Sequence, residues 1–162
     1  DNIKYSILTN ALMFKEFYTR VPNVINNLVE LGVSIDGATK DTYEKLRLGG
    51  KWDKINENLE CIAELKQKHG FRFILHFVVL KDNYHEMESI IDLGEQYGAD
   101  RVWLNKIEDW GTIDDFRTQD IFNTADYQRQ LDNVVKRIHQ RNDRFIECPT
   151  LISEAVRYKN KN

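Results

Sequence analysis

The sequence has little cysteine and no long apolar run. Its 162 residues include two cysteines, Cys61 and Cys148, which are too few for a disulfide framework. We therefore expect two small, buried structural thiols in a reducing, cytoplasmic setting. No stretch approaches the roughly 20 apolar residues of a membrane helix, and the first ten residues lack the layout of a signal peptide. These absences exclude a disulfide-stapled secreted module and indicate no membrane partner.

An excess of positive charge is also missing. The chain has 23 lysine and arginine residues against 26 aspartate and glutamate residues, which gives a net charge of -3. A chain with this balance offers no broad basic surface to a phosphate backbone, so we expect no nucleic-acid partner. The hydrophobic share of 41% and the charged share of 30% are those of an ordinary folded domain that is long enough to bury a core.

Strand-like and helix-like segments alternate along the chain. The strand-like segments are residues 3–10, 31–36, 71–80 and 100–107, with a further short extended segment at 144–149. The helix-like segments are residues 12–29, 51–69, 84–97 and 124–142. The expected helix caps are Thr39 or Asp41, Asn83, and Thr124 or Asp126. Strands that alternate with helices of this length predict βαβ units and a parallel sheet, hence an α/β fold.

Polar residues gather where the expected strands end. Thr9 closes the first strand, Asp36 the second, and Asn83 follows the third. In barrels and open α/β sheets, the carboxyl ends of parallel strands form the ligand-binding face. The plainer interpretation of each residue is a helix cap or a hydrogen bond to the backbone. Because the whole set falls on one edge of one sheet, a ligand face explains it better.

The stretch "SIDGATKDTYEKLR" joins such a strand end to a short helix. Ser34 and Asp36 are two residues apart on a strand, so their side chains face the same side. A carboxylate beside a hydroxyl suits a diol such as a ribose. Arg47, on the last turn of the short helix, can fork onto a carboxylate. The alternatives for Arg47 are a solvated helix position and a structural ion pair with a neighbouring acid.

Four stretches together carry a family resemblance. They are "SILTNA", "VSIDGATKDTYEKLR", "GGKWDKINENLE" and "FILHFVVLKDNYHEMESIIDLGEQYGADRVWL". In order and spacing they resemble the radical S-adenosylmethionine (radical SAM) superfamily, from about residue 3 to about residue 112. They are most similar to its branch of peptide-modifying and coenzyme-maturing enzymes. The resemblance implies a partial (β/α) TIM-like barrel with about four parallel βα units in residues 1–112, and a C-terminal helical extension in residues 113–162 packed on the barrel.

The resemblance also implies roles for particular residues. Thr9 and Ser34 would line a site for S-adenosylmethionine, with Asp36 as a further candidate. Arg47 would address the carboxylate of the methionine part, Asn83 would lie near the ribose, and Leu104 would touch the adenine. The acidic segment that holds Glu108, Asp109 and Trp110 would face a peptide or small-molecule substrate, unless it is simply a solvated loop.

One hallmark of the resembled family is missing. Its members carry a CxxxCxxC loop for a [4Fe-4S] cluster, which needs three thiolates, and this sequence has no such triplet. The resemblance therefore implies a fragment that corresponds to the third to sixth strands of the family barrel. We expect no metal site, no stoichiometric cofactor binding and no activity in this chain alone. The parent enzyme would use S-adenosylmethionine and a [4Fe-4S] cluster for oxidoreductase chemistry through a 5′-deoxyadenosyl radical.

Two other readings stay open at this point. The first is a TIM-barrel-like, aldolase-type enzyme in which Lys81 or Lys106 acts as an amine nucleophile. The second is a non-catalytic half-barrel that forms a homodimer through its exposed sheet edges.

Overall fold

The computed structural model describes residues 3–107, 124–141 and 144–151, and its centre is one five-stranded sheet. The strands are β1 (Tyr5–Thr9), β2 (Leu28–Ser34), β3 (Arg72–Val79), β4 (Arg101–Lys106) and β5 (Ile146–Glu147). They lie in chain order, and every neighbouring pair is parallel. The sheet is open, with β1 and β5 at its edges, as in part of a barrel. The predicted α/β fold with a partial barrel is confirmed.

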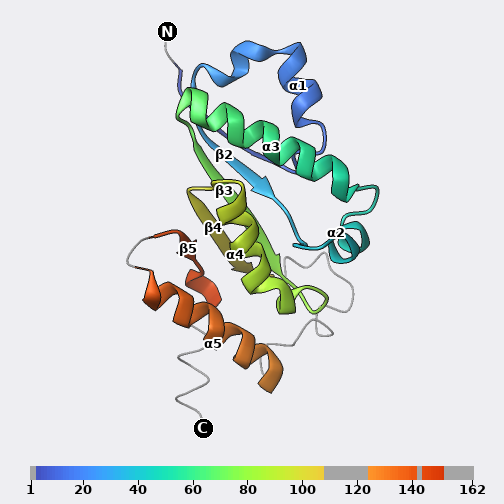
Figure 1. The fold of residues 1–162 in the computed structure, drawn as a ribbon, viewed down its shortest axis with the longest axis vertical. Coiled ribbons are helices and arrows are strands. Elements are labelled where there is room, and N and C mark those ends of the chain that lie inside the picture. Colours follow the sequence, from blue (N-terminus) through green and yellow to red (C-terminus); the bar gives the residue numbers. More distant parts are fainter. Residues whose placement is uncertain (1–2, 108–123, 142–143, 152–162) are drawn as a thin grey trace.

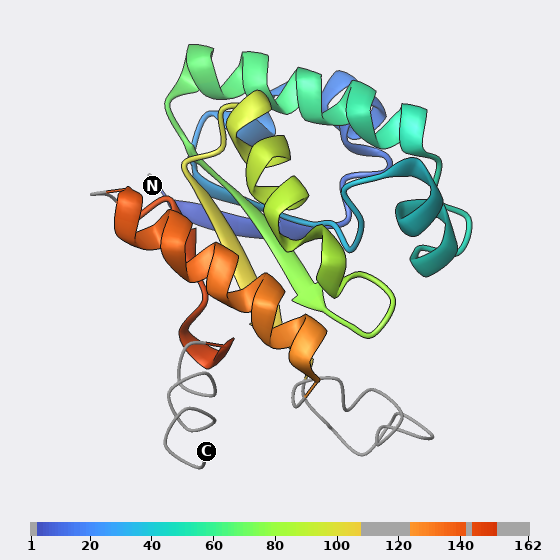
Figure 2. The same ribbon diagram turned by 60° about the horizontal axis from the view of Figure 1, so that its bottom comes forward.

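Helices cover one face of this sheet. The α-helices are α1 (Phe14–Arg20), α2 (Lys40–Leu46), α3 (Trp52–His69), α4 (Met87–Gln96) and α5 (Ala125–Gln140), and the 3-10 turns are η1 (Pro22–Ile25) and η2 (Tyr84–Glu86). Figure 1 shows α3 and α4 in front of the strands, and Figure 2 shows α5 running beside α4. The core lies between the sheet and this helical layer.

The two faces of the sheet differ in burial because side chains alternate along each strand. On the helical face, Leu31, Val33, Phe73 and Leu75 are completely buried. Each such side chain contributes about 1.5–3 kcal/mol by leaving water. On the opposite face, which we call the open face, Leu8 of β1 is 68% exposed. The open face is therefore the one that remains accessible to a ligand.

The N-terminal part differs from the sequence-based expectation. A helix over 12–29 was predicted, but α1 ends at Arg20 and Pro22 begins a 3-10 turn. The prediction of a long helix was wrong because proline and the asparagines that follow it interrupt the helical backbone. As a result β2 begins at Leu28, three residues before the predicted start. The extended segment at 144–149 is confirmed and supplies β5.

Most of the predicted helix ends are confirmed. The hydroxyl oxygen of Thr39 accepts a hydrogen bond from the Thr42 amide, and that of Thr124 accepts one from the Tyr127 amide. Gly70 ends α3 in the left-handed conformation, with φ of 75°. The prediction for Asn83 was wrong, because its side chain does not cap the following helix. Its amide makes other contacts, which are described below.

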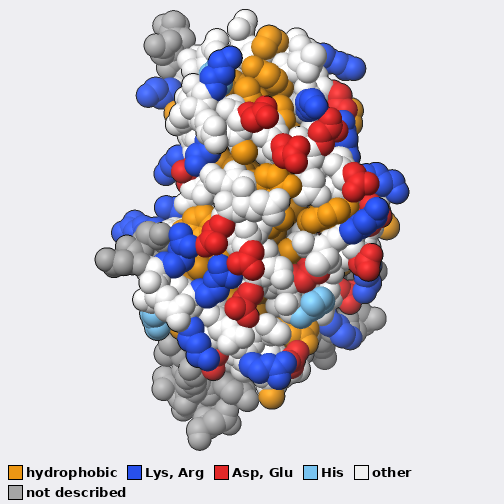
Figure 3. All heavy atoms as spheres, in the orientation of Figure 1, with side chains coloured by type: hydrophobic (Ala, Val, Ile, Leu, Met, Phe, Trp, Pro, Cys, Tyr) orange, Lys and Arg blue, Asp and Glu red, His pale blue; other side chains and the backbone are white. Residues whose placement is uncertain are grey.

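The surface that the helices present carries charges of both signs. Figure 3 shows basic and acidic side chains interleaved over α3 and α4, with apolar atoms between them. Many of these charges are ion-paired, such as Lys66 with Asp100 and Arg137 with Asp92. Within the described ranges, no helix combines the length and the apolar character that crossing a bilayer requires.

Candidate functional site

Three polar side chains meet at the carboxyl end of β2. Nη2 of Arg47 lies 2.7 Å from the hydroxyl oxygen of Ser34 and 2.7 Å from Oδ2 of Asp36. The side chains of Arg47 and Asp36 are only 25% and 16% exposed. We call Ser34, Asp36 and Arg47 the β2-edge cluster. Ser34 and Asp36 do face the same side, and the structural ion pair considered for Arg47 is present.

The guanidinium of Arg47 keeps donors in reserve. Its Nε is buried, and neither Nε nor Nη1 has a hydrogen-bond partner among the described residues. A guanidinium carries five N–H donors in one plane, so Arg47 can hold Asp36 and still address a second carboxylate. The β2-edge cluster therefore has unused capacity for an anionic group.

A close approach of backbone to backbone places Arg47 over the end of β2. A Cβ at Gly37 would lie 2.4 Å from the backbone nitrogen of Tyr43, so this approach requires glycine. Tyr43 is 1% exposed, and its ring packs against Trp52 with 5.7 Å between the ring centroids. Helix α2 is thereby folded back onto the strand end. Arg47 follows its last residue as the C-cap.

Asn83 fastens the same loop from the next strand end. It is fully buried, and its Nδ2 donates to the carbonyl oxygens of Asp36 at 3.0 Å and Val78 at 2.9 Å. Its Oδ1 accepts from the amide of Leu80 at 2.6 Å. Both N–H donors of the side chain are thus used within the protein. Asn83 contacts the backbone of the cluster rather than presenting its own amide to solvent.

An aromatic pair lies on the open face beside the cluster. His76 is in register with Ser34 and stacks on Trp103, with ring centroids 5.5 Å apart and planes at 24°. The imidazole lies over Gly32, where a Cβ would meet its Nε2 at 2.9 Å. Desolvation by burial lowers the pKa of His76 from its ordinary value of 6.5, and the carboxylate of Glu30 opposes this. The imidazole is therefore neutral at pH 7.

The other residues singled out in the sequence lie elsewhere. Thr9 pairs with Val33, which places it on the helical face, and its hydroxyl oxygen accepts from the Ala11 amide at 3.1 Å. Leu104 is also on the helical face and is completely buried. The structure therefore brings together Ser34, Asp36, Arg47 and the amide of Asn83, but not the side chains of Thr9 and Leu104.

Some expectations fall outside the described residues or gain no geometric support. The acidic segment with Glu108, Asp109 and Trp110 and the expected domain boundary at residue 112 lie outside the described ranges. Lys81 is exposed and Lys106 is half-buried. An amine nucleophile needs a desolvated setting, and an exposed Lys81 has none.

The two cysteines do not form a metal site. Burial raises the pKa of the Cys148 thiol to about 11, and Cys61 is half-buried on α3. In the part of the chain that the structure describes, no three histidine, cysteine or acidic side chains are grouped so that they could hold a metal ion. Two thiols cannot supply the three thiolates that a site-differentiated [4Fe-4S] cluster takes from protein. The residues of this chain do not fit such a cluster.

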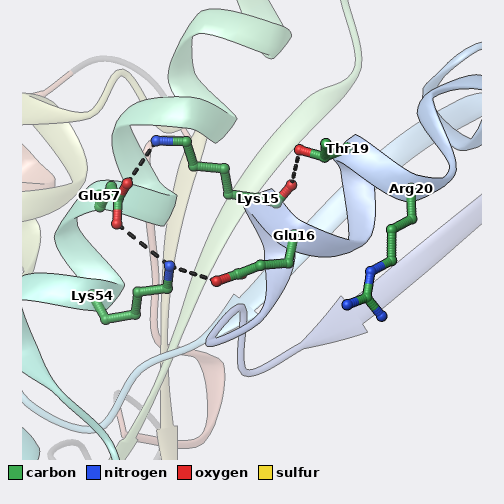
Figure 4. A pocket seen from close by; sticks show the side chains of 6 residues that line it. All are labelled: Lys15, Glu16, Thr19, Arg20, Lys54 and Glu57. Atoms are coloured by element: carbon green, nitrogen blue, oxygen red, sulfur yellow. Dashed lines mark hydrogen bonds and ion pairs between the residues drawn. The ribbon is translucent and has the colours of Figure 1, made fainter.

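A second hollow lies on the outer surface, between α1 and α3. It has a volume of about 330 Å³, and the residues that line it are Lys15, Glu16, Thr19, Arg20, Lys54 and Glu57. Figure 4 shows its charges paired across the two helices, Lys15 with Glu57 and Lys54 with Glu16, each at 2.6 Å. Exposed pairs of this kind contribute little to stability or binding. We interpret this hollow as a seam between helices.

Comparisons with known proteins reveal similar folds but no sequence family. No protein-family model matches the sequence, and no curated protein matches it either. Structures of SuiB from Streptococcus suis do match its fold. SuiB bound to the precursor peptide SuiA has a TM-score of 0.65 and covers 96% of this chain, and SuiB bound to S-adenosylmethionine has a TM-score of 0.62 and covers 94%.

Both SuiB structures are 17% identical to this chain, as is a third with a TM-score of 0.65. The chain spans about a third of the length of these structures, 33–34%. At this identity, the likeness is one of fold.

Proposed function

We propose that this chain provides the cofactor-binding part of a radical SAM oxidoreductase that modifies a peptide or a small molecule. The observation that carries the proposal is the β2-edge cluster, a half-buried arginine with unused donors at the carboxyl edge of a parallel sheet. Two further observations support it. The sequence resembles the radical SAM superfamily, and the fold is like that of SuiB, whose structures hold S-adenosylmethionine and a precursor peptide.

The cluster divides the binding task among its members. Arg47 would receive the carboxylate of the methionine part through Nε and Nη1, while Nη2 stays with Ser34 and Asp36. Asp36 would keep the guanidinium in place and offset its charge. Ser34 donates its own O–H to the ligand, since its oxygen accepts from Arg47. These residues bind and orient, and S-adenosylmethionine supplies the radical chemistry when it is bound.

The open face would receive what lies beyond the methionine part. His76 and Trp103 form a flat aromatic surface next to the cluster, and such surfaces stack well on planar groups. Asn83 acts through the backbone of Asp36 in this proposal. Contacts of Thr9 and Leu104 with the cofactor stay predictions that this geometry does not favour. Because the chain does not fit a [4Fe-4S] cluster, none of these roles depends on one.

Ligand titration followed by NMR tests the proposal on the isotope-labelled chain. We expect S-adenosylmethionine to bind weakly, in the millimolar range, and to shift the amide signals of Ser34, Asp36 and Arg47. Arg47→Ala should weaken binding at least about tenfold, the size of one charge-assisted hydrogen bond. Arg20→Ala is the matched control, because Arg20 is exposed and far along the chain from the cluster.

A second ligand isolates the carboxylate. Decarboxylated S-adenosylmethionine should bind the wild type and the Arg47→Ala variant equally, because it lacks the group that Arg47 addresses. Equal loss of affinity for both ligands in the variant would show that Arg47 does not read the carboxylate. Absence of any shift in the wild type at millimolar S-adenosylmethionine would refute the proposed function.

A further inference from the structure

A buried carboxylate lies behind the β2-edge cluster and joins it to η2. Glu86 is 4% exposed, although it is charged. Its Oε2 accepts from the amide of Ala38 at 2.6 Å. Its Oε1 accepts from the hydroxyls of Thr39 at 2.5 Å and Thr42 at 2.7 Å. We call these three contacts the Glu86 latch.

The latch is the main means by which this charge is tolerated. The nearest printed cation is Nε2 of His85 at 3.9 Å, which is beyond hydrogen-bond distance. A buried carboxylate without a close ion-pair partner is costly unless hydrogen-bond donors satisfy it. Ala38, Thr39 and Thr42 provide those donors, so any movement of residues 38–42 away from η2 would leave the charge unsatisfied. The segment is therefore pinned at its position.

Asn83 and Glu86 act as a pair. They are three residues apart on a 3-10 turn, and side chains at this spacing lie on the same side of such a turn. Asn83 holds the carbonyl of Asp36, and Glu86 holds residues 38–42 immediately after it. Turn η2 therefore grips the whole connection between β2 and α2.

The geometry points to Glu86 as a positioning residue. Its latch fixes the amino end of α2, α2 spans only seven residues, and Arg47 follows the last of them. We infer that Glu86 sets the place of the Arg47 guanidinium over Ser34 and Asp36. The purpose of that placement, a site for the cofactor carboxylate, rests on the proposed function, whereas the mechanical link from Glu86 to Arg47 does not.

The test reads the Arg47 side chain directly. In the labelled chain, the Nε–H signal of Arg47, assigned by its loss in Arg47→Lys, should exchange slowly because this atom is buried. Glu86→Ala should speed this exchange at least about tenfold, since it removes all three contacts of the latch. Glu86→Gln keeps one acceptor oxygen and should give a smaller change.

Two controls separate positioning from general destabilisation. Glu60→Gln removes an exposed carboxylate of α3 and should change nothing. Ile91→Val trims a completely buried side chain of α4, lowers the stability of the core, and leaves the latch intact. The inference is overturned if Arg47 exchange is unchanged in both Glu86 variants, or if Ile91→Val speeds it equally at matched stability.

Cofactor affinity supplies the remaining arm. Where the wild type binds S-adenosylmethionine, Glu86→Ala should weaken binding about tenfold and Glu86→Gln less, with Ile91→Val unaffected. Failure of the wild type to bind refutes the proposed function, while the Arg47 exchange data still decide the inference. Normal cofactor affinity in Glu86→Ala together with fast Arg47 exchange would refute the functional purpose of the latch and leave the mechanical link supported.

Discussion

Replacing Asn83 tests whether this residue is held by the protein or reserved for a ligand. Its side chain is fully buried and makes three hydrogen bonds to backbone groups. The partners are the amide of Leu80 and the carbonyls of Asp36 and Val78. In Asn83→Ala all three lose their partner at once, and the space left behind is too confined to restore each bond without rearrangement.

The magnitude follows from these contacts. A typical intramolecular hydrogen bond contributes about 1 kcal/mol net, and a buried polar group left without a partner costs about 1–3 kcal/mol. Three lost bonds therefore predict a destabilisation of about 3 kcal/mol for Asn83→Ala. Asn83→Asp keeps the volume but turns an oxygen toward two carbonyl oxygens, so its loss should be at least as large.

Urea unfolding, monitored by circular dichroism, measures the change in the free energy of unfolding. Asn105→Ala is the matched control, because Asn105 is half-buried near the end of β4 and its side chain has no hydrogen bond to a described residue. It should cost less than about 1 kcal/mol. A loss below about 1 kcal/mol for Asn83→Ala would refute the structural role and return Asn83 to the candidates for ligand contact.

Three further predictions concern the sheet and its cover. Because burial lowers the pKa of His76, the unfolded chain binds a proton near pH 6.5 that the folded chain refuses; unfolding free energy should fall as pH drops below about 6.5, and His76→Gln should flatten this dependence. Because the pKa of Cys148 is about 11, its thiol should react with alkylating reagents at pH 8 far more slowly than Cys61, as mass spectrometry of the labelled protein would measure. Gly94→Ala would place a Cβ 2.4 Å from Cγ2 of Val102, so a loss of about 1–2 kcal/mol is expected, and Val102→Ala in the same chain should recover part of it.

Local signals in the sequence located most of the elements. The apolar stripe and terminal glycine of residues 51–69 gave α3 to within one residue, and β3 and β4 lie inside their predicted runs. Such segments are readable because their own periodicity matches the side of the element that is buried. The connection around Pro22 was not readable in this way, because a weak helical pattern there competes with a 3-10 turn and an earlier strand.

The face on which each strand residue lies was harder to predict. Thr9, Ser34 and Leu104 all sit near carboxyl ends of strands, and the sequence alone ranked them together. Register decides between them: Thr9 pairs with the buried Val33, whereas Ser34 pairs with His76 on the open face. A shift of one residue exchanges the two faces, so proximity to a strand end does not fix where a side chain lies.

Long-range polar contacts escaped sequence analysis for a different reason. Glu86 follows a plausible helix start and reads as an ordinary first-turn acid, yet its partners lie 44–48 residues earlier. A recoverable signal was the pairing of two oxygen-rich stretches: Thr39 and Thr42 after one strand, Asn83 and Glu86 after the next. Neighbouring parallel strands bring such stretches to one edge of a sheet.

The charge balance at that edge explains how the cluster could take a ligand without being rebuilt. Asp36 neutralises Arg47 in the free protein, so the half-buried guanidinium is not left as an isolated charge. Because the pair uses only Nη2, an incoming carboxylate can bind at Nε and Nη1 without displacing Asp36. The resulting arrangement, two carboxylates around one guanidinium, carries one excess negative charge. A ligand that brings its own positive charge close to its carboxylate compensates for that excess, which favours a zwitterionic amino-acid group over a simple anion at this edge.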